Sequence, residues 1–504
     1  MAVRSTFPAG LALDAHKQQA CGAPIIELPQ PPRVALALDQ GSGYSAEPVV
    51  AVGATVAIGT LVARANHPYA SALHSPLAGT VAAIETRDAA TEGGRSVCIV
   101  IGSDGSGRID HRVRQAEGAA SLSPDELIQW LRDAGIAGLG GAGFPTATKL
   151  AAGRARGTQT LVLNGAECEP WICSDDALMR SAADEVVLGA ILLRRAAGAE
   201  RCVIAIEDDK PAAIAAVTHA IERQRNAAQG DHDQRDDELT LAVVPAVYPQ
   251  GAERQLITTV AGIEIRSGSL PADAGVICQN VATAAAVARW ATRGEPILSR
   301  VVTVTGSGVE HPCNVRAPIG TPLSALIAAA GGYRGTPLRL IAGGSMTGRA
   351  LPSDEVGVTK AMNCVLVATR EDIGSRLGAV EMPCIRCGDC ANVCPVGLLP
   401  QQLHRAAVAD AHDSLRELGV RDCIDCGLCD YVCPSQIPLA DRFRDARRRL
   451  NEADAMAARA ADARQRHETR THRLLEAAAA EQQAFESVRN RVRQSGDDPA
   501  GGTG

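Results

Sequence analysis

The sequence predicts a multidomain chain that combines α/β and α+β modules. Its 504 residues exceed one ordinary hydrophobic core and suggest about three or four domains. Short β-segments separated by turns fill the first part, and apolar strands alternate with Ala-rich helical segments in the middle. Eight cysteines crowd into a short stretch near the C-terminal end. These observations divide the chain into parts of different architecture.

Composition excludes some functions before any motif is considered. The net charge of −7 gives no electrostatic reason to bind nucleic acid, and aromatic residues make up only 2%. No stretch reaches the roughly 18 apolar residues of a membrane-spanning helix, and the N-terminus lacks the apolar core of a signal peptide. We therefore expect a cytoplasmic chain that binds no nucleic acid and that partners could hold at a membrane.

Lysine is rare, since nearly every basic residue is arginine. The four lysines are Lys17, Lys149, Lys210 and Lys360. Because arginine is used at nearly every other basic position, the four lysine positions can have a specific need for an ammonium group.

Residues 1–30 are expected to form an irregular lead-in, and residues 31–115 a β module. The segments "VAVGATVAIGTLVA" and "HSPLAGTVAAIE" resemble the two halves of a biotinyl- or lipoyl-type barrel sandwich. Those domains attach their cofactor to a hairpin lysine, and this region has none. The module is therefore expected to serve structure or docking.

Residues 120–290 predict an α/β domain that opens with a helix. In "SPDELIQWLRDAG", Ser123 can cap, Pro124 suits the first helical position, and Asp125 and Glu126 suit the first turn. The segments "TLVLNGAE", "RCVIAIED" and "LTLAVVPAVYPQG" then have the apolar pattern of buried strands.

The loop "GIAGLGGAGFPTATK" matches the dinucleotide pattern GxGxxG. A Rossmann turn needs a strand before it and a helix after it, whereas a helix precedes this loop and Phe144-Pro145 follows. A plain glycine-rich turn is one alternative. The other is a phosphate cradle, because closely spaced glycines expose backbone N–H groups and Lys149 can add positive charge. The glycines are Gly138, Gly140, Gly141 and Gly143.

Polar residues gather at the ends of the predicted strands, where ligands bind in open α/β sheets. Turn chemistry explains each group equally well, but several groups beside a glycine loop favour a site. The candidates are Asn164, Glu167, Glu169, Gly251, Glu253, Gln279, Asn280 and Thr283.

The cysteine run is a doubled C-x2-C-x2-C-x3-C-P motif, "CIRCGDCANVCPVG" and "CIDCGLCDYVCPSQ". This spacing is that of bacterial ferredoxins, in which the fourth cysteine binds the other cluster. We therefore predict two [4Fe–4S] clusters and not zinc, which prefers separated cysteine pairs. The first cluster is assigned to Cys384, Cys387, Cys390 and Cys433, and the second to Cys423, Cys426, Cys429 and Cys394.

Three further regions complete the division of the chain. Residues 298–372 have a strand, hairpin and helix pattern, and residues 375–445 contain the cysteine motifs. Residues 446–504 are rich in Arg, Ala, Glu and Gln, so we expect a charged tail that is helical or disordered.

Several of these motifs resemble those of a known family. "GLGGAGFPTATK", "NGAECEPW", "EDDKP", "YPQGAERQLI" and "CQNVATAAAV" are similar to motifs of the flavin- and NADH-binding subunit of respiratory complex I. Residues 30–445 as a whole resemble the RnfC family, which belongs to the Rnf ion-translocating electron transport complexes. The resemblance implies a barrel-sandwich module, an FMN/NADH-binding α/β domain, a soluble-ligand-binding (SLBB) β-grasp module and a ferredoxin-type domain.

The resemblance also implies roles for the candidate residues. The loop glycines and Lys149 would hold FMN, and Asn164, Asn280 and Thr283 would contact its ring or ribityl chain. Glu167, Glu169 and Glu253 would lie near the nicotinamide, and Gly251 would belong to the same cofactor site. The chain departs from the complex I pattern at three positions, which are Leu139, Ala166 and Cys168.

The implied function is electron input into a membrane complex. Electrons would pass between NAD(H), FMN and two [4Fe–4S] clusters to a ferredoxin-like subunit and membrane-embedded ion-translocating subunits, with no catalytic acid or base from the protein. The chain would be peripheral, on the cytoplasmic side of a bacterial inner membrane. A soluble NADH-dependent flavin and iron–sulfur reductase, such as a cobalamin reductase, is an alternative, and a non-catalytic iron–sulfur scaffold is another.

Overall fold

A computed structural model describes most of the chain. The residues outside the description are 1–8, 115–120, 229–237, 374–379 and 497–504. The chain divides into two compact units, and the first contains both cysteine motifs. The first unit comprises Met1–Gln402 and Arg421–Ala440, and the second Leu403–Val420 and Asp441–Gly504.

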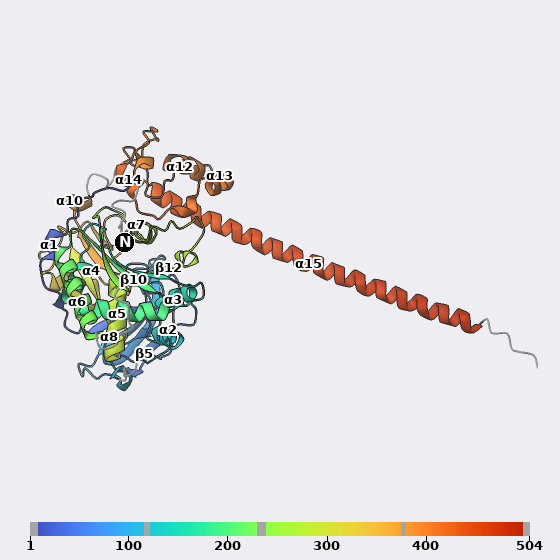
Figure 1. Cartoon of the computed structure of the whole chain (residues 1–504), viewed down its shortest axis with the longest axis horizontal. Helices are drawn as coiled ribbons and strands as arrows, with labels where there is room; N and C mark the ends of the chain where they lie inside the picture. The colour runs from blue at the N-terminus through green and yellow to red at the C-terminus, as the bar shows by residue number, and fades with distance from the viewer. Residues whose placement is uncertain (1–8, 115–120, 229–237, 374–379, 497–504) are drawn as a thin grey trace, which may run out of the picture. The chain divides into compact units, whose positions relative to one another are not determined.

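The N-terminal module of the first unit consists of two small antiparallel sheets (Figure 1), with strand orders β2-β8-β7-β4 and β3-β5-β6. The apolar segments of the sequence form these strands and bury Leu36, Val62, Val81 and Ile99. The predicted barrel-sandwich class is confirmed. The strands are β2 (Arg33–Ala37), β3 (Glu47–Pro48), β4 (Thr55–Val56), β5 (Leu61–Arg64), β6 (Leu73–His74), β7 (Gly79–Asp88) and β8 (Arg95–Ser103), followed by a 3-10 turn at His111–Arg114.

The described part of the lead-in is more ordered than expected. It contains the short helix α1 (Gln18–Cys21) and strand β1 (Ile26–Glu27), which pairs in parallel with β14 (Cys313–Pro318). Asn314 donates a hydrogen bond to the carbonyl of Ala20 at 3.1 Å. Sequence periodicity could not reveal a strand of this length, because its position depends on a partner far along the chain.

The α/β domain is built on a four-stranded parallel sheet in the order β11-β10-β9-β12. Strand β9 is buried along nearly its whole length, which is why its sequence is a continuous apolar run. Figure 1 labels several of the helices around this sheet. The strands are β9 (Thr160–Gly165), β10 (Arg201–Glu207), β11 (Leu239–Val244) and β12 (Val276–Asn280). The helices are α2 (Pro124–Asp133), α3 (Thr146–Arg154), α4 (Ser174–Ser181), α5 (Ala183–Ala197), α6 (Pro211–Ala228), α7 (Glu253–Ala261) and α8 (Val281–Arg293), with a 3-10 turn at Pro271–Ala274.

Helix α2 begins as its sequence predicts. The Ser123 side chain accepts a hydrogen bond from the Glu126 N–H, and the Glu126 carboxylate accepts one from the Ser123 N–H at 2.8 Å. This capping box satisfies two backbone donors at the start of the helix.

The β-grasp module has a six-stranded mixed sheet in the order β1-β14-β13-β17-β15-β16. Strand β13 pairs in parallel with β17 and antiparallel with β14. The remaining elements are β13 (Ser299–Thr305), β15 (Arg339–Ala342), β16 (Arg349–Leu351), β17 (Cys364–Ala368), α9 (Leu323–Ala329) and α10 (Arg370–Ile373).

The two cysteine motifs adopt the same local conformation. Each contains a short helix, α11 (Asp389–Asn392) or α14 (Leu428–Val432), preceded by a left-handed glycine with φ of 89° at Gly388 and 73° at Gly427. Arg386 and Asp425 also occupy equivalent positions, with φ of 59° and 56°. The sequence repeat is therefore a structural repeat.

The second unit is helical. It contains most of α12 (Pro400–Val408), α13 (His412–Glu417) and α15 (Leu439–Gly496), with a 3-10 turn at Val420–Asp422 next to the boundary. Arg416 and Asp454 form an ion pair at 2.5 Å. From Ala455 onward every described side chain of α15 is exposed. Within the described residues, no helix combines the length and apolarity needed to cross a membrane.

Candidate functional site

A cavity of about 600 Å³ lies in the first unit, within the size range typical of cofactor and ligand sites. Three modules and the second cysteine motif contribute to its wall. The lining includes eleven of the predicted site residues, namely Gly138, Gly140, Gly141, Lys149, Asn164, Glu167, Glu169, Gly251, Glu253, Gln279 and Asn280. Gly143 and Thr283 are not in the lining.

The glycine loop closes on itself between α2 and α3. The Gly138 N–H donates to the Phe144 carbonyl at 2.8 Å, and the Gly143 N–H donates to the Gly138 carbonyl at 3.2 Å. At the tip, the N–H groups of Gly140, Gly141 and Ala142 have no acceptor among the described residues. These residues line the cavity, so the loop offers free donors of the kind that bind phosphate.

The sequence argument against a Rossmann turn was wrong in one of its two parts. Helix α3 does follow the loop, starting at Thr146 with Pro145 as its N-cap. Proline is compatible with a helix start because the first N–H groups have no partner within the helix. The other part is confirmed, because helix α2 precedes the loop and a Rossmann turn needs a strand there.

The loop glycines have different physical roles. Gly141 has a φ of 109°, a conformation that other residues rarely adopt. A Cβ atom on Gly140 would lie 3.1 Å from the Asn280 Cβ, and one on Gly143 would lie 2.7 Å from the Gln40 carbonyl. Gly143 therefore allows close packing on the barrel-sandwich module and is not part of the cavity wall.

Buried side chains that are not in the cavity lining hold the loop. The Leu139 N–H donates to the Thr283 hydroxyl at 2.9 Å, and Arg300 donates to the Leu139 carbonyl at 3.0 Å. Lys360 donates to the Gly135 carbonyl at 2.7 Å. The structure thus places Thr283 behind the loop. Only the rarity of lysine pointed to Lys360, and nothing in the sequence pointed to Arg300.

Lys149 and Glu253 form an ion pair at 2.6 Å in the cavity wall. Burial by itself would lower the pKa of Lys149, but the charge and hydrogen bond of Glu253 outweigh it and raise the pKa. The lysine therefore remains an ammonium at neutral pH, held in place by a carboxylate at the start of α7.

The polar strand ends meet at one edge of the sheet, as their sequence positions predict. Asn164 donates to the Gly251 carbonyl at 2.8 Å and accepts from the Ala166 N–H at 3.0 Å. Asn280 donates to Asp175 at 2.6 Å and caps helix α8. Much of their hydrogen bonding therefore serves the protein scaffold around the cavity.

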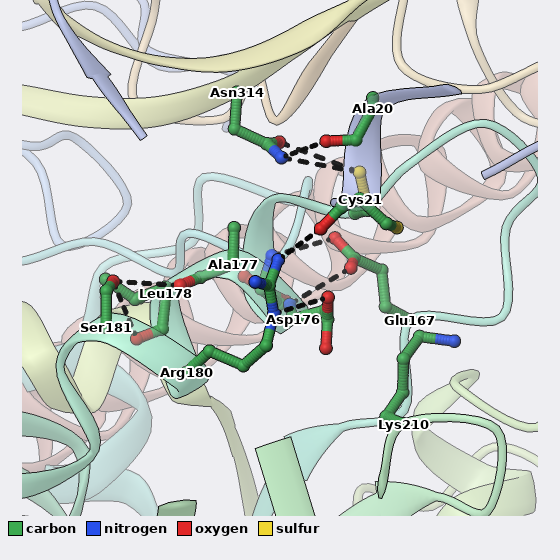
Figure 2. Close-up of polar contacts among 12 residues, drawn as sticks. Ala20, Cys21, Glu167, Asp176, Ala177, Leu178, Arg180, Ser181, Lys210 and Asn314 are labelled. Atoms are coloured by element: carbon green, nitrogen blue, oxygen red, sulfur yellow. Dashed lines mark hydrogen bonds and ion pairs between the residues drawn. The ribbon is translucent and has the colours of Figure 1, made fainter. Parts of the chain in front are cut away.

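The carboxylates of Glu167 and Glu169 are also used by protein donors. Glu167 accepts from the Ser174 hydroxyl at 3.1 Å and from the N–H groups of Asp175 and Asp176, at the start of α4. Figure 2 shows the Glu167 carboxylate beside Asp176. Glu169 accepts from the Met346 and Thr347 N–H groups. Both residues line the cavity, but neither presents a carboxylate free of protein contacts.

The second cysteine motif reaches the cavity. Ile424 and Cys426 belong to its lining, and the Tyr248 hydroxyl donates to the Cys426 carbonyl at 2.7 Å. In contrast, Cys384 and Cys387 of the first motif are exposed.

The thiols of each motif lie close enough to influence one another electrostatically. Burial raises the pKa of Cys426 to about 12, and the nearby Cys423 and Cys394 contribute to the same direction. Cys394 of the first motif therefore lies near Cys426 of the second, while the crosswise ligation stays a prediction. Among the described residues, no three or more His, Cys, Asp or Glu side chains are placed so that they could together hold a metal ion.

Family comparisons follow the same division of the chain. Residues 5–106 match the RnfC barrel sandwich hybrid domain, and residues 131–289 match the Nuo51 FMN-binding domain. Residues 301–350 match the SLBB domain, and residues 383–437 match the 4Fe-4S dicluster domain. These modules define the class of the chain as an iron–sulfur flavoprotein.

Curated relatives narrow the class to one family. The RnfC-type subunit of the ion-translocating oxidoreductase complex from Pseudomonas aeruginosa is 42% identical over 475 residues, which cover 94% of this chain and 59% of that protein. Its Vibrio cholerae counterpart is 40% identical, covering 82% and 52%. The Serratia proteamaculans counterpart is 37% identical, covering 99% and 71%. The chain belongs to this RnfC family of ion-translocating oxidoreductase complexes, and it spans somewhat more than half the length of the first two relatives.

A solved structure has a similar fold. An NAD⁺-reducing [NiFe]-hydrogenase in the H2-reduced state matches with a TM-score of 0.50 and 23% identity, covering 66% of this chain and 62% of that chain. At this identity the likeness concerns the fold alone.

Proposed function

We propose that this chain binds FMN in the cavity and transfers electrons between NAD(H) and two [4Fe–4S] clusters. The observation that carries the proposal is that one cavity joins the glycine loop to the second cysteine motif. Gly140 and Gly141 offer free N–H donors there, and Cys426 belongs to the same wall. A flavin held by the loop would therefore lie beside a cluster ligand.

The residues of the loop suit the charge of FMN. The free N–H groups of Gly140 and Gly141 would bind its phosphate, and the ammonium of Lys149 would add a fixed positive charge. When bound, FMN supplies the exchange between an electron pair carried as hydride and single electrons. The surrounding side chains position the cofactor and limit water, and no side chain needs to act as an acid or base.

The placement of the motifs also suggests an order of transfer. Cys426 lines the cavity, so the cluster assigned to Cys423, Cys426, Cys429 and Cys394 would lie next to it and would be reduced first. The other cluster, whose assigned ligands Cys384 and Cys387 are exposed, would deliver electrons to a partner. The two electrons of one hydride from NADH would suffice to reduce each cluster by one electron, leaving NAD⁺ and one proton.

The partners follow from the family. Relatives are subunits of an ion-translocating oxidoreductase complex. We propose that a ferredoxin-like subunit accepts electrons from this chain, and that membrane-embedded subunits translocate the ion. The chain would then act as a peripheral subunit on the cytoplasmic face of a bacterial inner membrane.

The proposal is tested on the full chain, purified without oxygen and supplied with FMN. NADH should bleach the flavin absorbance and produce the electron paramagnetic resonance signals of reduced [4Fe–4S] clusters. Gly141→Val should weaken FMN binding at least tenfold, because its side chain would enter the cradle. Gly157→Val is a matched control, since Gly157 also has a positive φ, open surroundings and no place in the cavity wall.

Three outcomes would contradict the proposal. A wild-type chain that binds iron but no FMN would favour the iron–sulfur scaffold. Equal FMN affinity in the two glycine variants would place the flavin elsewhere. Full NADH activity in a chain that never purifies with membrane subunits would favour a soluble reductase.

A further inference from the structure

A loop of the β-grasp module connects the cavity to the second cysteine motif. This loop, residues 343–348, joins β15 to β16, and Gly344 and Thr347 line the cavity. Met346 packs in an apolar cluster with Cys426 and Leu428 of the motif. One short segment therefore contacts both the cavity and the motif.

The backbone of the loop also fits closely against the motif. A Cβ atom on Gly427, the residue after Cys426, would lie 3.1 Å from the Met346 carbonyl oxygen. The Tyr248 hydroxyl approaches the same turn by donating to the Cys426 carbonyl at 2.7 Å. A displacement of the loop would therefore change the packing around a cluster ligand.

One side chain of the α/β domain holds this loop. The Glu169 Oε1 atom accepts from the Met346 N–H at 2.8 Å and from the Thr347 N–H at 3.0 Å. Its Oε2 atom accepts from the Thr347 hydroxyl at 3.1 Å. A Cβ atom on Gly344 would lie 2.2 Å from the Glu169 Cγ, so the loop also packs directly on the side chain.

We propose that Glu169 is a positioning residue for electron transfer between the cavity and the second cysteine motif. By fixing the 343–348 loop, it sets the packing of Met346 against Cys426 and thus the placement of the adjacent cluster relative to the flavin. The proposal rests on the proposed function and adds the residue that aligns the two redox sites. The carboxylate acts as a hydrogen-bond acceptor for the loop, and its charge is not required.

The acceptor role makes alanine and glutamine behave differently. Glu169→Ala removes all three acceptor contacts and leaves the two N–H groups without their partner. Glu169→Gln keeps an amide oxygen that can accept from both N–H groups, and its NH2 group can donate to the Thr347 hydroxyl. If Glu169 acted instead through its negative charge beside a ligand, both variants would lose that charge and should show equal defects.

The first measurement requires neither flavin nor turnover. Hydrogen–deuterium exchange of the full chain should show the Met346 and Thr347 amides exchanging at least tenfold faster in Glu169→Ala, and within threefold of wild type in Glu169→Gln. The spectrum and midpoint potential of one of the two dithionite-reduced clusters should change in Glu169→Ala only. Unchanged exchange and unchanged clusters in Glu169→Ala would overturn the proposal.

The second measurement follows electrons from flavin to cluster by stopped-flow spectroscopy. Glu169→Ala should slow this step severalfold, because the loop would no longer hold Met346 against Cys426, and Glu169→Gln should restore it. Gly344→Ala would place a Cβ atom against the Glu169 side chain and push the loop away from it. This variant should therefore have a similar effect. The double variant Glu169→Ala/Gly344→Ala should be no slower than the slower single variant, because both act through one loop.

The possible failures are distinguishable. Additive losses in the double variant, or equal defects in the Ala and Gln variants, would overturn the positioning role. If the wild-type chain bound no FMN, the proposed function would fail, while the exchange and cluster measurements would still test the contact between Glu169 and the loop.

Discussion

The side-chain amine of Lys360 is buried and contacts only neutral oxygens. Its Nζ atom donates to the Ser71 hydroxyl at 2.9 Å and to the carbonyls of Ala72 and Gly135, each at 2.7 Å. No carboxylate among the described residues pairs with it. Burial lowers its pKa from 10.5 to about 7. Replacing it with methionine tests whether this charge links the stability of the first unit to pH.

The direction of the effect follows from proton binding. Between pH 7 and pH 10.5, Lys360 is protonated in the unfolded chain and largely neutral in the folded one. Because the unfolded state binds more protons at this site, Lys360 should contribute a rise with pH to the free energy of unfolding in this window, by at most about 1.4 kcal/mol per pH unit. Buried thiols such as Cys98, whose pKa burial raises to about 11, contribute in the opposite direction. The whole window corresponds to an upper limit of about 5 kcal/mol.

Urea unfolding at several pH values between 7 and 9.5 provides the assay. All three tryptophans, Trp130, Trp171 and Trp290, belong to the first unit, so their fluorescence reports its unfolding. Lys360→Met should remove the contribution of this lysine, so that its stability changes with pH with a slope lower than that of the wild type by up to about 1.4 kcal/mol per pH unit. It should also lower stability at every pH, because three buried acceptors lose their donor.

Lys149→Met, measured without FMN, is the matched control. The Lys149 ammonium lies 2.6 Å from Glu253. Burial alone would lower its pKa, but the charge and hydrogen bond of Glu253 outweigh burial and raise it. Its stabilising contribution is therefore complete below pH 10.5, and this variant should keep the wild-type slope between pH 7 and 9.5. A slope in Lys360→Met equal to that of the wild type would refute the reasoning.

Other substitutions test the site and its support. Cys390→Ala should reduce bound iron and slow electron delivery to partners while NADH still reduces the flavin; loss of flavin reduction in the folded variant would contradict the modular arrangement. Gly143→Ala should destabilise the chain by at least about 1 kcal/mol more than Gly157→Ala, measured by urea unfolding, because only the former meets the Gln40 carbonyl. Lys149→Met should weaken FMN binding about tenfold by calorimetry, a loss of about 1.4 kcal/mol, since it removes positive charge beside the predicted phosphate position. Equal affinity in that variant would show that the phosphate lies elsewhere.

The sequence predicted the cysteine repeat in most detail. Four cysteines within a few residues, with a glycine at a fixed place, restrict the local backbone so strongly that distant contacts add little. The equivalent left-handed residues Gly388 and Gly427 follow directly from that spacing. The helix start at Ser123 was equally local, because each capping partner lies within one turn of the other.

The glycine loop was predicted only in part. Its free donors could be inferred from the glycines themselves, but the helix that begins at Thr146 was missed because Pro145 was treated as a helix breaker. Gly143 and Thr283 were predicted to contact FMN, but neither lines the cavity. Their partners, Gln40 and Leu139, show that they serve packing and loop support.

The sequence by itself determined the classes of the modules and the position of the glycine loop, and it predicts the cluster ligands, since these features depend on residues close together in the chain. Tertiary structure decided which groups remain available in the site and which support it. Glu169 and Met346 lie 177 positions apart, and Lys360 meets oxygens from two other modules. These contacts form because folding buries polar groups, and each buried group needs a hydrogen-bond donor or acceptor nearby. The spacing of residues along the chain does not determine which group that will be.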